Sequence, residues 1–305
     1  MRQTARIATA VLLMAAGTQA RADTNPTEAN AANAANAAIQ VAGNKGATFQ
    51  PLPQNVQEDV GNIRPADQAS VLSYFHSEVD LNGQYTSNAP LYHSHDKADF
   101  LIAPALQGGF TAPLNKYLTL DLEARIEDFT YVSFQKLGFW GFSGNADLEY
   151  RYEPSWPCVY VGMSPYYYFS YANGNRLTAA IGPVAGVNQS YSINRGKTLF
   201  FASYEFGDYF SSPTIDTRQS HTVTLSLTQQ LRRDLYAQVY YQFEYSDYNV
   251  YGRDETRDVM GLSLIHQFNP RTFLSVFVNY VDNASNNTLA KYTTVNSGLS
   301  LVWQY

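Results

Sequence analysis

Acidic and basic side chains recur at every second position in two parts of the sequence, residues 117–128 and 142–152. Carboxylates gathered around water attract cations and repel anions, so this pattern could line a cation-preferring channel. Two further acids belong to the same inferred face of later segments. The charged candidates for a pore lining are Asp121, Glu123, Arg125, Glu127, Asp147, Glu149, Arg151, Glu205 and Glu244.

The same charged residues also allow a structural interpretation. If residues 117–128 and 142–152 form neighbouring strands, their acids and arginines would lie opposite one another in a lattice of salt bridges. Such a lattice could fill the interior, or it could leave a gap through which solutes pass. Both interpretations stay open at this stage.

Tyrosines form a second group with recognisable chemistry. Residues 166–169 read Tyr-Tyr-Tyr-Phe, and Tyr171 follows. We expect these rings to form an aromatic girdle at a membrane–water interface near a loop. In the alternative interpretation, four tyrosines line the pore and their rings could stack on sugars: Tyr166, Tyr168, Tyr236 and Tyr240.

The histidines offer little catalytic chemistry. Hydrolysis through a nucleophile needs a base and an orienting group within hydrogen-bond reach. Only the loop with His93 and His95 could supply the base, and no motif around it marks a nucleophile. With Asp96 the same loop carries ligand types for a divalent metal, but its spacing matches no established metal motif. We therefore expect no enzyme activity, no metal site and no cofactor.

Strands must position these residues. In residues 117–128 leucine, alanine and isoleucine alternate with charged residues, and a period of two is that of a β-strand. Short turns alternate with longer polar loops along the rest of the chain. Twelve segments of this kind follow one another: 73–86, 99–111, 117–128, 142–152, 159–171, 177–188, 198–209, 220–231, 235–245, 257–268, 272–282 and 292–305.

This organisation predicts an all-β fold, a transmembrane antiparallel up-and-down β-barrel of about 12 strands. One gap, residues 189–197, is long where a short turn is expected. We therefore expect a bulge or a miscounted strand there.

Composition favours a membrane barrel over a soluble β-sandwich. Charged residues make up only 15% of the chain, whereas aromatic residues reach 14%. The polar face of a soluble sandwich meets bulk water and should be rich in lysine and glutamate, and its strands are usually shorter. The single cysteine, Cys158, excludes an internal disulfide framework.

The N-terminal residues differ from the strand-rich remainder. Residues 1–22 have a positive start, an apolar run of ten and a small-residue cleavage site, which predict a secretory signal peptide. Its removal takes away three arginines, so the net charge falls from −6 to about −9, which argues against a nucleic-acid partner. Residues 23–70 have few aromatic or β-branched residues and predict a flexible periplasmic segment, followed by the barrel over 71–305.

The last strand ends on alternating large residues, Leu299, Leu301, Trp303 and Tyr305. This resembles the C-terminal signature by which the barrel assembly machinery recognises outer-membrane proteins. The stretch NPRTFLSVFVNYVDNASNN followed by NSGLSLVWQY is similar to the closing hairpin of bacterial outer-membrane β-barrel (porin-like) proteins, which the chain resembles over residues 71–305. The resemblance implies a bacterial outer-membrane location in contact with lipid, and a porin role.

Taken together, these features predict a porin-like channel for passive diffusion of small hydrophilic solutes, with a weak cation preference. The first alternative is a non-conducting barrel that scaffolds an envelope complex through a periplasmic partner bound to residues 23–70. The second alternative is an outer-membrane hydrolase.

Overall fold

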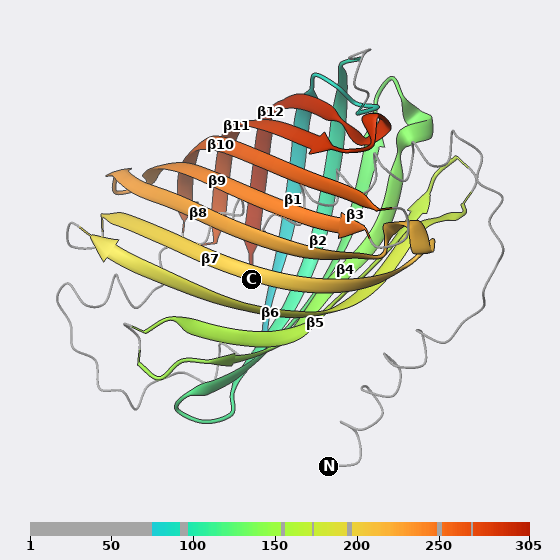
Figure 1. The fold of residues 1–305 in the computed structure, drawn as a ribbon. Coiled ribbons are helices and arrows are strands. Elements are labelled where there is room, and N and C mark those ends of the chain that lie inside the picture. Colours follow the sequence, from blue (N-terminus) through green and yellow to red (C-terminus); the bar gives the residue numbers. More distant parts are fainter. Residues whose placement is uncertain are drawn as a thin grey trace.

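Twelve antiparallel strands close into a barrel in the computed structural model (Figure 1). The structure describes residues 75–91, 97–153, 156–172, 174–193, 197–248, 252–269 and 271–305. The predicted fold class is confirmed. The strands are β1 (Phe75–Thr86), β2 (Asp99–Pro113), β3 (Leu118–Tyr131), β4 (Phe139–Tyr150), β5 (Cys158–Ser170), β6 (Arg176–Ile193), β7 (Thr198–Ser212), β8 (Arg218–Arg232), β9 (Leu235–Tyr248), β10 (Arg253–Asn269), β11 (Thr272–Ser285) and β12 (Tyr292–Gln304).

Each strand pairs with the next along the chain, and β1 pairs with β12 to close the barrel. The closing register places Glu78 opposite Gln304 and Thr86 opposite Asn296. Two backbone hydrogen bonds between Ser77 and Tyr305 extend this seam by one step. Every strand in the described part of the chain therefore has a neighbour on both sides, as a bilayer requires, because unpaired backbone groups are costly in lipid.

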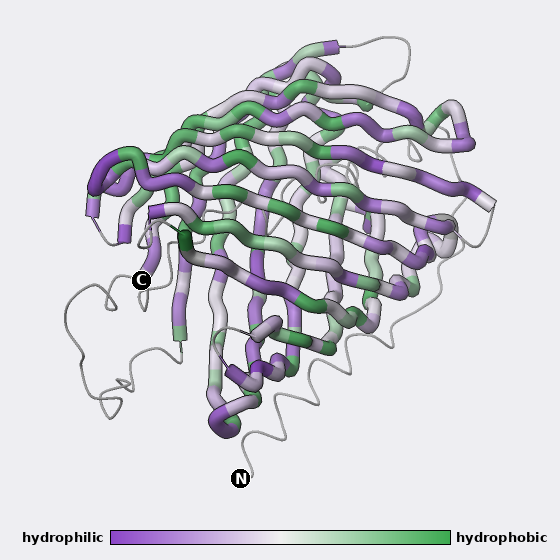
Figure 2. The backbone as a smooth tube through the Cα atoms, turned by 60° about the vertical axis from the view of Figure 1, so that its left-hand side comes forward, coloured by the Kyte–Doolittle hydropathy of each residue, from purple (hydrophilic) through white to green (hydrophobic). Residues whose placement is uncertain are grey.

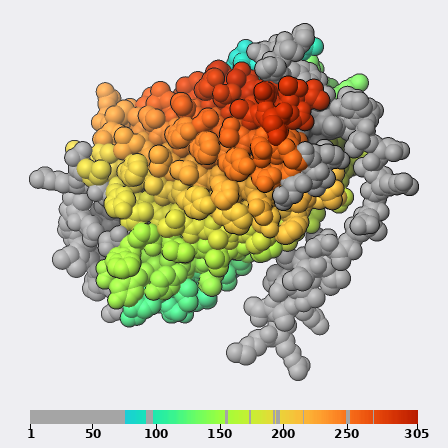
Figure 3. All heavy atoms as spheres, in the orientation of Figure 1, coloured from blue at the N-terminus to red at the C-terminus, as the bar shows by residue number. Residues whose placement is uncertain are grey.

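Hydrophobic and hydrophilic residues alternate along the strands (Figure 2), and their burial shows that the outward face is apolar and the inward face largely polar. On β10, for example, Met260, Leu262 and Leu264 are about half exposed, whereas the intervening Ser263 is buried. The space-filling view in Figure 3 shows the continuous outer wall that β7 to β12 form. Alternation along a strand therefore separates a lipid-facing surface from the interior.

The connections differ between the two ends of the barrel. At one end β8 joins β9 and β10 joins β11 through two-residue gaps, and Asn115 accepts hydrogen bonds from the backbone N–H groups of Tyr117 and Leu118 in the turn before β3. The other end has 3₁₀ turns η4 (Gln135–Leu137), η5 (Thr214–Asp216) and η6 (Thr288–Ala290). Short turns are typical of the periplasmic end of outer-membrane barrels. Across the described residues, no helix has the length and apolarity needed to span a bilayer.

The expectation of a bulge or miscounted strand at residues 189–197 is wrong. β6 continues to Ile193, so only residues 194–197 connect it to β7. The pairs from Ala179↔Ser212 to Ile193↔Thr198 keep one register throughout. The continued backbone pairing with β7 carries β6 past the point where apolar alternation fades. The predicted signal peptide, the segment 23–70 and the histidine loop 92–96 lie outside the described residues.

Candidate functional site

The barrel interior gathers most of the charged and aromatic residues that the sequence singles out. The alternation and burial of β3, β4, β7 and β9 place them on the inward face. Arg151 follows the end of β4 and is exposed, so it lies at the periplasmic end rather than within the wall. The inward-facing candidates are Asp121, Glu123, Arg125, Glu127, Asp147, Glu149, Glu205, Tyr236, Tyr240 and Glu244.

Arg125 is the centre of a charge network on the wall formed by β1, β2 and β3. Its Nε donates to Oε2 of Glu127 at 3.0 Å, and its Nη2 lies 3.6 Å from Oδ2 of Asp80. Its Nη1 donates to Oε1 of Gln107 at 3.2 Å, and Gln107 in turn donates to Glu123. All three nitrogens of this guanidinium therefore have partners.

In the predicted lattice between residues 117–128 and 142–152, Arg125 has other partners than expected. The two segments are neighbours, as expected, but the register places Arg125 opposite Ser143 and Glu123 opposite Asn145. Arg125 therefore pairs with Asp80, two strands away in the other direction, and not with an acid of β4. The hairpin turn between β3 and β4 sets this register, and alternation alone does not encode it.

Interior tyrosines lie against the wall over glycines of neighbouring strands. Tyr160 of β5 reaches past β6 and donates to Oε2 of Glu205 on β7 at 2.8 Å. A Cβ on Gly186 of β6 would overlap the Tyr160 ring, so the glycine makes room for this contact. Tyr240 lies over Gly261 in the same manner. Rings held against the wall take up less of the bore than rings that point across it.

The tyrosine run of β5 divides between the two faces. Tyr167 and Phe169 face outward and stack on Phe142 and Trp140, with ring centroids 5.1 and 5.0 Å apart. This outer pair fits the expected girdle. Tyr166 and Tyr168 do not belong to it, because period-two alternation turns them inward and leaves them 6% and 0% exposed. The girdle interpretation is wrong for these two residues.

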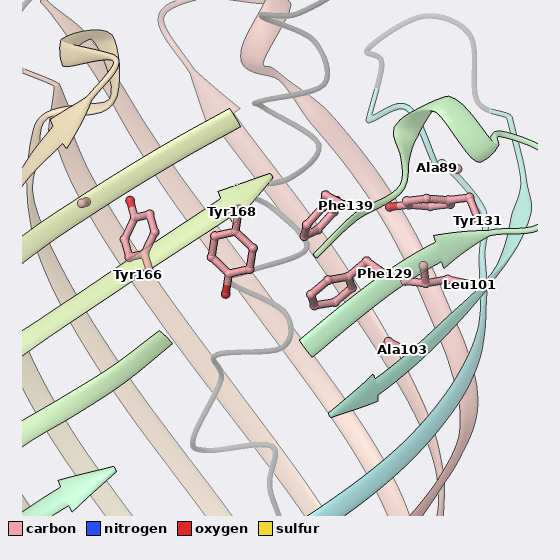
Figure 4. Packing of buried hydrophobic residues seen from close by; sticks show 9 residues of the cluster. Ala89, Leu101, Ala103, Phe129, Tyr131, Phe139, Tyr166 and Tyr168 are labelled. Atoms are coloured by element: carbon pink, nitrogen blue, oxygen red, sulfur yellow. The ribbon is translucent and has the colours of Figure 1, made fainter. Parts of the chain in front are cut away.

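An apolar cluster lies on the interior wall near the loop-rich end of β2 to β5 (Figure 4). Phe129 and Phe139 stack with ring centroids 4.4 Å apart, and Tyr168 meets Phe139 edge to face. Tyr168 also donates to Glu127, so it joins this cluster to the charge network around Arg125. The inward side chains of β2 to β5 are therefore mainly aromatic near the loop-rich end and mainly acidic further along the strands.

Three inward-facing arginines were not among the predicted pore residues: Arg218, Arg253 and Arg257, on β8 and β10. Arg218 and Arg253 precede the predicted strands 220–231 and 257–268, because the alternation of apolar residues begins only after them. Every second residue of β8 and β10 faces inward, and continuing this alternation back to the first residue of each strand identifies both arginines. The inward acid Glu255 also precedes its predicted strand, whereas Glu78 and Asp80 lie within the predicted strand 73–86, where apolar alternation is too weak to identify the inward face.

Histidines within the described residues lie apart from one another. His221 faces outward, where its Nδ1 lies 2.8 Å from the Tyr204 hydroxyl. His266 also faces outward and lies 3.7 Å from Asp234 at the short-turn end. His76 packs over Gly109 on the inward side of β1.

The C-terminal residues predicted as an assembly signal lie on the outward face of β12. Leu299, Leu301 and Trp303 are between 38% and 53% exposed, and Tyr305 is 74% exposed. Lipid can reach all four side chains. Their part in recognition by the assembly machinery stays a prediction.

Residues 173–305 match the model of a protein family described as "Putative beta-barrel porin 2". The sequence matches no curated protein. An outer membrane channel from Pseudomonas putida F1 is similar in structure, with a TM-score of 0.54 and 11% identity over 80% of this chain and 100% of that chain. The NanC porin has a TM-score of 0.43 and 13% identity over 74% of this chain and 98% of that chain. In-vitro folded OmpT of Vibrio cholerae has a TM-score of 0.42 and 9% identity over 76% of this chain and 96% of that chain.

The family match and the closed barrel confirm the expected resemblance to porin-like outer-membrane β-barrels, and with it the location in the bacterial outer membrane. At 11% identity, the likeness to the Pseudomonas putida channel shows the fold alone.

Proposed function

We propose that this porin-like outer-membrane barrel is a channel for passive diffusion of small hydrophilic solutes, with a weak cation preference. The observation that carries the proposal is the surplus of acids over arginines on the inward face of the described strands. The inward acids are Glu78, Asp80, Asp99, Asp121, Glu123, Glu127, Asp147, Glu149, Glu205, Glu244 and Glu255, and the inward arginines are Arg125, Arg218, Arg253 and Arg257.

The proposed mechanism is partition of a solute into a polar bore. Hydroxyl, amide and carboxylate groups on the wall replace part of the solute's hydration shell, and surplus negative charge raises the local concentration of cations. Tyrosines held over glycines, such as Tyr160 over Gly186, line the bore without crossing it. The concentration gradient drives the flux, so neither a cofactor nor an energy source is required.

We further propose that the barrel catalyses no reaction and that residues 1–22 are a leader removed on export. Supporting the first point, none of the three histidines in the described part of the chain has a serine hydroxyl as hydrogen-bond partner. Outer-membrane hydrolase activity and scaffolding through residues 23–70 remain the alternatives that the conductance experiment separates from a channel.

Conductance in planar bilayers tests the channel. We expect discrete current steps in KCl and a reversal potential that indicates a K⁺ over Cl⁻ preference. The triple variant Glu123→Gln/Glu149→Gln/Glu244→Gln should move the permeability ratio towards one, because it removes three inward charges while keeping side-chain size.

The matched control carries three amide substitutions on the outward face, Asp208→Asn/Asp258→Asn/Asp282→Asn. It should keep the wild-type ratio, because these side chains do not face the bore. Absence of current across a range of salt concentrations would overturn the channel proposal. A wild-type ratio in the inward triple variant would overturn the cation preference.

A further inference from the structure

Three arginines are buried on the inward face of β8 and β10. Arg218, Arg253 and Arg257 are 6%, 8% and 3% exposed. A guanidinium cannot lose its charge at physiological pH, so burial requires acceptors for its N–H groups. This makes the partners of each nitrogen informative.

One nitrogen of the Arg257 guanidinium lies near an acid, and the other two have no hydrogen-bond acceptor. Its Nη1 lies 3.6 Å from Oε2 of Glu244. Its Nε and Nη2 are buried and have no hydrogen-bond partner. These two nitrogens carry parallel N–H bonds on one edge of the guanidinium plane, and this fork matches the two oxygens of a carboxylate. The unpartnered edge is therefore shaped for a planar anion with two oxygens.

Arg218 repeats part of this arrangement nearer the loop-rich end. Its Nη1 donates to the Tyr166 hydroxyl at 3.2 Å, and its guanidinium lies 5.0 Å from the Tyr209 ring centroid and 5.8 Å from that of Tyr248. Its Nε is buried without a partner. Aromatic faces stabilise the cation but accept no hydrogen bond from this nitrogen.

The local charges leave room for one more anion. Glu244 pairs with Arg257, and Glu255 lies 3.2 Å from Nε of Arg253. Arg218 has hydroxyl and ring contacts rather than an acid within salt-bridge distance. On the inward faces of β8, β9 and β10, three arginines against two glutamates leave one surplus positive charge, whereas Glu205 lies on neighbouring β7 and the interior as a whole is acidic.

The surroundings of Arg257 suit the carbon skeleton of a solute. Val259 follows it on the inward face of β10 and packs with Tyr240, Val281 and Tyr292 in one buried cluster. Because both nitrogens are buried, neighbouring side chains must move before a carboxylate can reach this edge, and its attached carbons would then lie beside these rings and methyl groups. Inorganic anions would gain nothing from that surface.

We propose that Arg257 binds the carboxylate of a small hydrophilic solute in the barrel interior, with Arg218 as an additional positive group nearer the loop-rich end. The proposal rests on the proposed function only in requiring that solutes enter the bore. A carboxylate solute would thus be held at one positive point in a bore that otherwise disfavours anions.

Calorimetric titration of the full-length barrel in detergent tests binding without requiring conductance. The probe is glucuronate, and glucose is its neutral counterpart because it differs by one carboxylate. We expect saturable heat with glucuronate and none with glucose. Arg257→Lys keeps the charge but lacks the two-pronged edge, so it should weaken glucuronate binding at least about tenfold.

The matched control is Arg125→Lys, an identical exchange at a guanidinium whose nitrogens all have partners. It should leave the glucuronate dissociation constant within about twofold of wild type. Equal heats from glucose and glucuronate, or full affinity in a folded Arg257→Lys, would overturn the proposal. Circular dichroism shows whether Arg257→Lys is folded. If it is not, the comparison of glucose with glucuronate on the wild-type protein still tests whether the barrel binds a carboxylate. If the wild-type barrel conducts but gives no saturable glucuronate heat, this site alone is refuted, whereas absent conductance refutes the channel.

Discussion

At the scale of single residues, long side chains connect strands that are not hydrogen-bonded neighbours. Tyr168 of β5 reaches past β4 to donate to Glu127 of β3. Both residues are buried, at 0% and 3% exposure, and Glu127 also accepts from Arg125. A hydrogen bond to a buried charged group contributes more than a neutral one, because the group has little access to water. The Tyr168 hydroxyl is therefore expected to contribute measurably to stability.

Tyr168→Phe removes this hydroxyl and keeps the ring in its apolar cluster. We expect the free energy of unfolding to fall by about 1.5–3 kcal/mol, the range for a hydrogen bond to a charged group. Urea titration of the barrel refolded in lipid vesicles measures it. Tyr167→Phe is the control, since Tyr167 faces outward and stacks on Phe142. Equal losses in the two variants would show that the Glu127 contact adds nothing.

At the scale of elements, glycines on the inward face allow neighbouring strands and their side chains to approach. A Cβ on Gly141 of β4 would overlap the backbone oxygen of Tyr167 and the ring of Tyr168 on β5. Backbone cannot move aside as a flexible side chain can, so the β4–β5 pairing depends on this residue. Gly108 of β2 faces outward, and its nearest obstacle is the His76 oxygen at 4.0 Å.

Gly141→Ala should therefore destabilise the barrel by about 1–3 kcal/mol, as overpacking typically does. Gly108→Ala should lie within about 0.5 kcal/mol of wild type, as surface substitutions usually do. Thermal unfolding followed by heat-dependent migration on gels compares them. Equal stability of both variants would show that β4 and β5 adjust to the added methyl group.

At the scale of the whole molecule, the barrel separates charge by face and by wall. Outward faces carry apolar residues through the middle of each strand, and the inward acids concentrate on β1, β3 and β4. The buried arginines of β8 and β10 lie on a different part of the wall. The expected ion selectivity thus arises from fixed charges on the wall, and mobile ions can screen these charges.

The K⁺ over Cl⁻ permeability ratio should consequently fall as salt concentration rises. The Debye length shrinks from about 10 Å at 0.1 M to about 3 Å at 1 M, which is shorter than the distance over which wall charges would act on a passing ion. Reversal potentials measured at a fixed KCl gradient and increasing mean concentration provide the check. A ratio independent of salt would contradict selection by fixed charge and favour selection by size.

The strand count, the barrel class and the face on which most residues lie follow from the amino-acid pattern alone. These properties are local, because successive side chains of any strand point to opposite sides. The same rule places Tyr166 and Tyr168 on the face opposite to Tyr167, as the burial of β5 shows.

Contacts between side chains of different strands do not follow from that pattern and depend on the folded barrel. Arg125 contacts Asp80 rather than an acid of β4, and Arg218 contacts Tyr166 three strands away. Such contacts depend on register and on closure of the barrel, which turns and backbone pairing set over the whole chain. The same pairing extends β6 to Ile193 and brings Arg218 and Arg253 into the wall. Strand ends are set by the partner strand, so a single segment's alternation does not reveal them.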